Sequence, residues 1–235
     1  MLKNLNKIDK YWLIFLCLSG LLASVLIGDS IFSVSVLLSG VCCVALIAIG
    51  RVEGYWVGIY QCITYAYIAY GNGLFGEVML NLGFYLPTSI IGIYLWNKNT
   101  TKDVVKMRAL SWKYRLGILI LCILFILILG YGLSTIEKQN NPYMDATTNV
   151  LSVIATFLML YRYLEQWFLY FTLNIVSVAM WVLRWQDSGK LENGNDIDLM
   201  IIMWILFLIN SIYGSWRWYK GSQLNLPEET VKEHS

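Results

Sequence analysis

The apolar residues of this chain gather into eight long stretches, which short polar breaks separate. A helix needs roughly 20 mostly apolar residues to cross the hydrocarbon core of a bilayer. The stretches lack the in-and-out alternation of membrane strands, so helices are expected. The predicted spans cover residues 11–28, 31–50, 54–71, 76–96, 114–134, 146–161, 166–185 and 198–218. Residues typical of turns occupy the breaks at 29–30, 71–73 and 192–196.

Composition supports this interpretation. Hydrophobic residues make up 58% of the 235 residues and charged residues only 14%, whereas a soluble domain usually carries about 25% charged residues. The fold class expected is therefore an all-α integral membrane protein with eight transmembrane helices.

The distribution of positive charge predicts the orientation of these helices. Fourteen of the 17 Lys and Arg residues fall on one side, and only Lys138, Arg184 and Lys190 fall on the other. Because the side rich in Lys and Arg faces the cytoplasm, both termini are expected there, in a multi-pass protein of the bacterial cytoplasmic membrane. The first stretch is interpreted as a retained span rather than a cleaved signal peptide.

An internal repeat relates the two halves. Residues 89–98 match residues 211–220 at five of ten positions, and residues 53–56 match residues 165–168. Spans two to four thus recur as spans six to eight in the same orientation, joined by span five, which is the plan of SWEET-type transporters. The alternative is that Trp, Tyr and Lys merely collect at a membrane interface, as they commonly do.

This repeat predicts five segments. They are an N-terminal tail and extra helix at 1–30, a first triple-helix repeat at 31–98, a cytoplasmic loop and linker helix at 99–140, a second triple-helix repeat at 141–220 and a cytoplasmic tail at 221–235. In such folds the substrate lies near the midplane between the repeats.

The seventh span carries the richest candidate chemistry. Trp167, Tyr170, Asn174, Ser177 and Trp181 recur at spacings of three and four, so they share one helical face. An unpaired amide in hydrocarbon costs roughly 2–7 kcal/mol, so Asn174 needs a partner, either another helix or a ligand. Indole faces stack on flat heterocycles and attract cationic rings, which favours a ligand.

Other polar residues lie in the middle of predicted spans. Pro87 interrupts the fourth span and can kink it or serve gating. Thr88 and Asn210 correspond through the repeat, which suggests polar groups placed symmetrically about the site. The expected substrate-binding residues are Trp167, Tyr170, Asn174, Trp181, Asn81, Tyr85, Thr88, Asn210 and Gln61.

Several kinds of chemistry find no support in the sequence. No acidic or basic residue lies mid-span, which argues against proton coupling. The five cysteines lie within apolar stretches without metal-site spacing, and the one histidine, His234, belongs to a polar tail. No Walker A, zinc-protease or nucleophile-elbow motif occurs. We therefore expect no enzyme activity, no metal and no cofactor.

Two sets of motifs resemble the PnuC family of nicotinamide riboside transporters. The first set comprises Asn141-Pro-Tyr-Met-Asp145-Ala146, Arg162-Tyr-Leu-Glu165-Gln166-Trp167, Asn174-Ile-Val-Ser177 and Met180-Trp181. The second comprises Gly76-Glu77, Leu80-Asn81, Tyr85-Leu86-Pro87 and the segment from Gly92 to Trp96. Together they extend from about Arg51 to Lys220.

The resemblance implies a SWEET-like 3+1+3 fold, often trimeric. It also implies facilitated diffusion of nicotinamide riboside, with uptake driven by a cytoplasmic kinase that phosphorylates the substrate. The family's Trp-x-x-Trp followed by Asn appears here as Trp167, Tyr170 and Asn174, with Tyr in place of the second Trp. The glutamines expected near Ser89 and Thr156 are missing, which leaves thiamine, riboflavin and deoxynucleosides open as substrates.

The function expected is therefore uniport of nicotinamide riboside or a related flat vitamin or nucleoside. Two alternatives from other classes are a substrate-capturing subunit of an ATP-driven importer and, less favoured, an intramembrane enzyme. Uptake that strictly requires a partner ATPase would favour the former, and conversion of the solute by the isolated chain would favour the latter.

Overall fold

The computed structural model describes residues 5–27, 30–71, 75–135, 141–187 and 194–224. The expectations for Asp29, Asn72, Glu192 and His234 lie outside these residues, as do those for Lys138 and Lys190.

Within these described residues eight helical stretches cross the bundle, as predicted from hydropathy, and one of them consists of three consecutive segments. Six of the eight are long and apolar enough to span a membrane by length and composition. The helices are α1 (Lys7–Ile27), α2 (Ile31–Ile49), α3 (Glu53–Gly71), α4 (Phe75–Leu80), the π-helical η1 (Asn81–Tyr85), α5 (Leu86–Asn97), α6 (Trp112–Ser134), α7 (Pro142–Leu160), α8 (Gln166–Asp187) and α9 (Gly194–Leu224).

The helix ends follow from local chemistry. The Ser30 hydroxyl accepts a hydrogen bond from the Ser33 amide at 3.1 Å and caps α2. Gly50 ends α2 in the left-handed conformation, with φ of 83°, which glycine adopts without steric cost. Pro142 opens α7, where its missing amide hydrogen is not needed.

The π-helical turn η1 accommodates Pro87. Leu86 donates its amide to the Asn81 carbonyl, five residues back rather than four. Proline has no amide hydrogen to donate, and its ring crowds the preceding helical turn. The wider π-helical turn directly before Pro87 gives the ring the space it needs. The extra residue also rotates α5 relative to α4.

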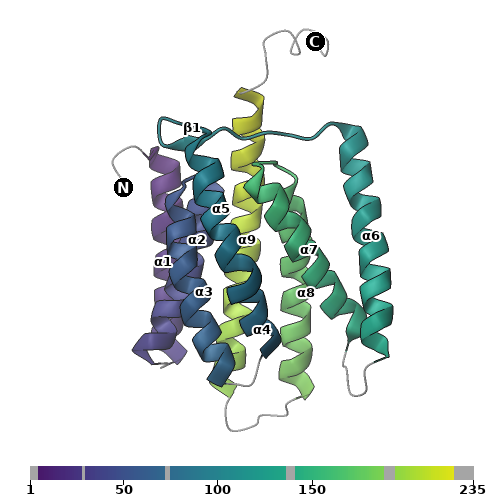
Figure 1. Cartoon of the computed structure of the whole chain (residues 1–235). Helices are drawn as coiled ribbons and strands as arrows, with labels where there is room; N and C mark the ends of the chain where they lie inside the picture. Colours follow the sequence, from purple (N-terminus) through teal and green to yellow (C-terminus); the bar gives the residue numbers. More distant parts are fainter. Residues whose placement is uncertain (1–4, 28–29, 72–74, 136–140, 188–193, 225–235) are drawn as a thin grey trace.

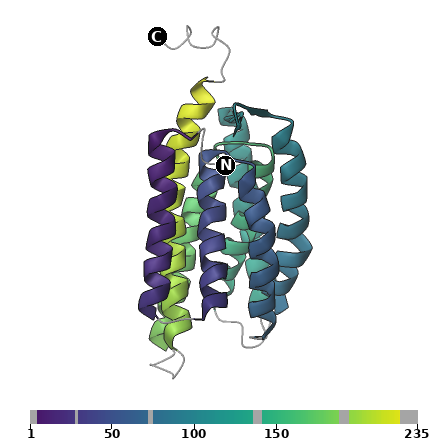
Figure 2. The ribbon, with the colours of Figure 1, turned by 90° about the vertical axis from the view of Figure 1, so that its left-hand side faces the viewer.

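The helices form one bundle in which two groups of three pack internally. One group comprises α2, α3 and the α4–η1–α5 stretch, and the other comprises α7, α8 and α9. Contacts between the groups run from α2 to α9 and from α5 to α7. Helix α6 stands at the edge of the bundle against α7, and α1 lies beside α2 and α9 (Figure 1 and Figure 2).

One end of the bundle carries twelve of the described basic residues, and we call it the basic end; Arg184, near the end of α8, lies toward the opposite end. The start of α1, the end of α9 and strand β1 all lie there (Figure 1). The start of the first helix and the end of the last on one side are what an even number of spans requires. The basic residues are Lys7, Lys10, Arg51, Lys98, Lys102, Lys106, Arg108, Lys113, Arg115, Arg162, Arg217 and Lys220.

The segment between α5 and α6 ties both helix groups together at the basic end. It forms a hairpin of β1 (Thr100–Thr101) and β2 (Val104–Val105), which the sequence analysis did not predict. The Val105 amide donates to the Gly50 carbonyl at 2.9 Å, and the Arg108 amide donates to the Arg162 carbonyl at 2.8 Å. The connection therefore holds the loop after α2 and the loop after α7.

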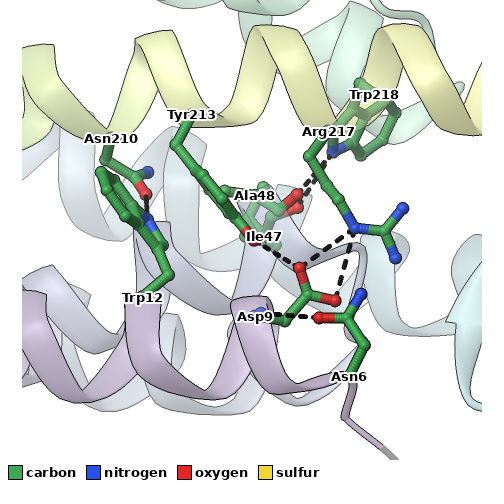
Figure 3. A network of polar contacts seen from close by, with 9 residues as sticks. All are labelled: Asn6, Asp9, Trp12, Ile47, Ala48, Asn210, Tyr213, Arg217 and Trp218. Atoms are coloured by element: carbon green, nitrogen blue, oxygen red, sulfur yellow. Dashed lines mark hydrogen bonds and ion pairs between the residues drawn. The ribbon is translucent and has the colours of Figure 1, made fainter.

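Helix α1 is fastened to α9 by a buried polar network (Figure 3). The Asp9 carboxylate accepts hydrogen bonds from Tyr213 and, at 3.1 Å, from Arg217 Nε. The Trp12 ring stacks on Tyr213 at 4.3 Å, and its Nε1 donates to Asn210 at 3.0 Å. The sequence analysis began this span near Tyr11. The helix instead begins four residues earlier, at Lys7, and thereby places a carboxylate inside the bundle.

Candidate functional site

The predicted polar face of α8 points into the bundle. Trp167, Asn174 and Ser177 are buried, and Tyr170 and Trp181 are half-buried. The opposite side of the helix is exposed and apolar, and it includes Phe168, Phe171 and Ile175. The amphipathic pattern therefore orients α8 with its rings and amides toward the other helices.

Trp167 lies against a glycine of α9. A Cβ at Gly214 would stand 2.5 Å from the indole ring, so only glycine permits this approach. The ring also meets Trp218 edge-on at 6.2 Å and Tyr170 at 6.0 Å. Within the described residues the buried Nε1 of Trp167 has no hydrogen-bond partner.

Asn174 has a partner on a neighbouring helix. Its Nδ2 donates to the Ser211 hydroxyl at 2.7 Å, and that hydroxyl donates to the Phe207 carbonyl at 2.8 Å. The sequence left a helix or a ligand open as the partner, and in this conformation a helix satisfies the amide nitrogen.

A row of hydroxyl groups connects α8 and η1 to α7. The Tyr170 hydroxyl lies 3.3 Å from that of Thr156 and 3.9 Å from the Met159 sulfur. Tyr85 on η1 shares a hydrogen bond with Ser152, one turn before Thr156. These groups offer both donors and acceptors and carry no formal charge.

Three further predicted residues lie within the first helix group. Asn81 is buried at the start of η1. Thr88 is buried, and its hydroxyl donates to carbonyls of its own helix at 2.8 and 3.0 Å. The side chains of Gln61 and of Phe207 on α9 both lie close to Gly40 of α2. Gln61 therefore lies where the two helix groups meet.

Asn210 is directed toward α1 and α2. It accepts from Trp12 Nε1 at 3.0 Å and donates to the Val44 carbonyl at 2.9 Å. In this conformation the Asn210 amide is thus bonded to two neighbouring helices. The expected symmetry with Thr88 does not extend to these contacts, because Thr88 bonds within its own helix.

Equivalent tryptophans make equivalent hydrogen bonds across the bundle. Trp96 Nε1 donates to the Met159 carbonyl at 3.0 Å, and Trp218 Nε1 donates to the Ile47 carbonyl at 3.3 Å (Figure 3). The two tryptophans are 122 residues apart, and the two acceptors are 112 residues apart. These are the offsets of the sequence repeat. The two rings are fully buried and lie 5.7 Å from each other.

Rings at equivalent positions also lie on equivalent glycines. Tyr55 of α3 stands against Gly92 of α5, where a Cβ would come within 2.4 Å of the ring. Trp167 and Gly214 form the matching pair in the second group, at 2.5 Å. In each group, then, an aromatic residue near the start of one helix packs against a glycine of a neighbouring helix.

A third pair of equivalent contacts, between a lysine and an aromatic ring, lies at the basic end. The Lys98 ammonium lies 4.2 Å from the centre of the Tyr94 ring, and the Lys220 ammonium lies 4.1 Å from the centre of the Trp216 ring. Both pairs are four residues apart on a helix, and the two pairs differ by the same 122 residues.

Tyr55, Trp96 and Trp218 were not predicted from the sequence to be parts of this central cluster. The match between residues 53–56 and 165–168 contained the necessary information, because it pairs Tyr55 with Trp167. Asp9 was likewise not predicted to be buried, because it lies among the lysines of the N-terminal segment.

Buried charges in the described residues are paired and lie toward the basic end. Glu165 accepts from Arg115 Nε at 2.8 Å and from the Leu110 amide at 3.1 Å. The ion pairs are Arg51 with Glu53 and Asp103, Arg115 with Glu165, and Arg217 with Asp9. No group of His, Cys, Asp and Glu among the described residues has the arrangement of a metal site.

A surface recess of about 460 Å³ lies apart from this cluster. Glu53, Trp56, Val57 and Tyr60 line it on α3. Trp56 and Tyr60 are exposed on the outside of the bundle, so the recess opens away from the interior residues described above.

Comparison with known proteins places this fold in a family. The pattern of the family described as nicotinamide mononucleotide transporter matches residues 30–220. The nicotinamide riboside transporter PnuC of Neisseria mucosa is 30% identical over 203 residues, which cover 84% of this chain and 72% of the relative. PnuC of Haemophilus influenzae is 28% identical over 213 residues, covering 89% and 88%.

A solved structure agrees with these matches. The crystal structure of the vitamin B3 transporter PnuC superposes with a TM-score of 0.77 at 27% identity, covering 94% of both chains. The helical bundle, its apolar spans and these relatives all describe a multi-pass membrane transport protein rather than an enzyme. The chain belongs to the nicotinamide mononucleotide transporter family, the family of the PnuC proteins.

Proposed function

We propose that this chain carries nicotinamide riboside across the cytoplasmic membrane by facilitated diffusion. The observation that carries the proposal is the interior of the bundle, where the buried face of α8 presents rings, an amide and hydroxyls. The relatives from Neisseria mucosa and Haemophilus influenzae are named for the same substrate.

The chemistry of the substrate fits such an interior. Nicotinamide riboside combines a flat cationic ring with a carboxamide and a sugar. Aromatic faces attract a cationic ring by about 0.5–2 kcal/mol, and hydroxyl and amide groups suit the polar parts. The proposed binding residues are Trp167, Tyr170, Asn174, Trp181, Asn81, Tyr85, Thr88 and Gln61.

The family's description names the mononucleotide, but the riboside suits this interior better. A phosphate group would need a cation to receive it. The buried Arg51 and the half-buried Arg217 already pair with carboxylates near the basic end. Neither of these two arginines is therefore free to receive a phosphate group.

We further propose the SWEET-like 3+1+3 plan, with α2 to α5 and α7 to α9 as parallel repeats, α6 as linker and α1 as an extra helix. Three sets of equivalent contacts support it: the tryptophan hydrogen bonds, the ring-on-glycine contacts and the cation–π pairs. Interface enrichment in Trp, Tyr and Lys explains only the last of these. The substrate would bind between the repeats.

The basic end is proposed to face the cytoplasm, following the positive-inside rule. Uniport then moves substrate down its gradient, and phosphorylation by a cytoplasmic kinase would trap it inside the cell. The paired state of the buried carboxylates supports transport without proton coupling. The resemblance to PnuC transporters also implies a homotrimer.

Uptake into proteoliposomes tests the function. Vesicles containing the chain and no energy source should accumulate labelled nicotinamide riboside until the inner and outer concentrations are equal. An imposed proton gradient should change neither the rate nor the plateau. Failure to equilibrate the riboside, while thiamine, riboflavin or a deoxynucleoside does equilibrate, would reassign the substrate. Uptake only with an added ATPase would indicate a capturing subunit.

A further inference from the structure

Five aromatic residues form a continuous series of contacts between the two helix groups. Tyr55 meets Trp96 at 5.0 Å, Trp96 meets Trp218 at 5.7 Å, and Trp218 meets Trp167 at 6.2 Å. Trp167 in turn meets Tyr170 at 6.0 Å. Tyr170 also packs against the hydrophobic core cluster that contains Tyr55. Helices α3, α5, α8 and α9 thus supply one continuous aromatic layer.

Two of these five residues have polar atoms without a partner. Tyr55 is 2% exposed and Trp167 is 3% exposed, and both are buried well beyond nine-tenths. Neither the Tyr55 hydroxyl nor Trp167 Nε1 makes a hydrogen bond to any described residue. The tryptophans beside them differ in this respect, because both donate to backbone carbonyls.

Leaving a buried donor unsatisfied is unfavourable by about 1–3 kcal/mol, so two such donors in one layer need an explanation. The two residues occupy equivalent positions, 112 apart in the sequence, each against the glycine of its own group. Packing against the glycines fixes the two rings, but the Tyr55 hydroxyl and Trp167 Nε1 remain without hydrogen bonds to the described residues. The same arrangement in both groups indicates a shared role rather than an isolated packing defect.

We propose that Tyr55 is a substrate-binding residue, the first-group counterpart of Trp167, and that the two form a pair of donors for acceptor oxygens of the solute. An indole Nε1 can only donate, and a tyrosine hydroxyl donates readily. The pair therefore suits a hydroxyl or carbonyl oxygen of a sugar or carboxamide. This inference rests on the proposed function, since it names a further residue of the same site.

The neighbours of Tyr55 agree with this role. Cys43 and Tyr170 both pack against the core cluster that contains Tyr55, and both side chains are uncharged. Tyr170 itself reaches Thr156 on α7. A solute held by Tyr55 would thus also lie near the hydroxyl groups that connect α7 and α8.

The test is the Tyr55→Phe substitution, which removes only the hydroxyl. The matched control is Tyr60→Phe on the same helix, because the Tyr60 hydroxyl faces outward and lies 3.1 Å from the Ser35 hydroxyl. Calorimetry on the purified full chain would measure the Kd for nicotinamide riboside, with thiamine, riboflavin and a deoxynucleoside in parallel. Thermal unfolding without ligand would be recorded for each variant.

Loss of one hydrogen bond to a neutral group should raise the Kd of Tyr55→Phe about two- to tenfold. Its unfolding temperature without ligand should stay unchanged or rise, because the hydroxyl has no protein partner to lose. A Kd equal to that of Tyr60→Phe and of the unmodified chain would overturn the inference alone. A chain that binds none of the four solutes would overturn the proposed function as well.

Discussion

The contact between Gly214 and Trp167 offers the sharpest test of the structure. Replacing Gly214 by alanine adds one methyl group, which would lie 2.5 Å from Cδ2 and Cε3 of the indole. Carbon atoms in favourable contact stand about 3.5–4.0 Å apart, so the ring would have to retreat by about 1 Å. The fully buried Trp218, one turn after Gly214 on α9, also packs edge-on against the same ring at 6.2 Å, so the indole is held closely on the α9 side.

The size of the effect follows from this overlap. Overpacking of a well-filled core typically costs about 1–3 kcal/mol. For a chain of this length, each kcal/mol lowers the unfolding temperature by about 2–4 °C. Gly214→Ala should therefore unfold about 2–12 °C below the unmodified chain, and its affinity for substrate should also fall because Trp167 is displaced.

Thermal unfolding in detergent, followed by intrinsic tryptophan fluorescence, would measure the difference. Gly117→Ala is the matched control, since a Cβ at Gly117 on α6 would meet nothing within 4 Å. Alanine favours a helix over glycine by about 1 kcal/mol, so this variant should be unchanged or slightly more stable. Equal unfolding temperatures for the two variants, with equal substrate affinity, would refute the close contact.

Three further predictions concern buried polar contacts. Asn174→Ala should weaken substrate binding in calorimetry, whereas binding equal to that of the unmodified chain would remove this face of α8 from the site. Asp9→Asn should lower the unfolding temperature, because breaking a buried ion pair costs about 3–5 kcal/mol and Arg217, only 18% exposed, would lose its partner. Glu165→Gln should destabilise less, because Arg115 is 38% exposed; urea or thermal titration of both variants would compare them.

The controls for the two ion-pair variants change the partner side chain or the salt concentration. A double change of Asp9 to Asn and Arg217 to Gln should recover part of the stability lost in the single variant, since no unpaired charge remains. Strictly additive losses would show that the two side chains act independently. For Glu165, high salt should narrow the difference from the unmodified chain, because the exposed part of the pair is screened.

Hydropathy alone determined the number and kind of spans. In hydrocarbon a backbone must satisfy its own hydrogen bonds, so a long apolar stretch can only be a helix. The eight stretches are therefore found as helices, and the predicted face of α8 with Trp167, Asn174 and Ser177 is buried. The matches to the PnuC family were also readable from motifs in the sequence.

Tertiary structure decided which polar groups meet. Periodicity assigns residues to a helical face, but it does not say which neighbour that face contacts. Asn210 thus bonds to α1 and α2, and Asn174 bonds to Ser211. The π-helical turn before Pro87 adds a rotation of α5 that no ideal helical wheel contains. Tyr55 and Trp167, 112 residues apart in the chain, join one aromatic layer only because the two groups pack against each other.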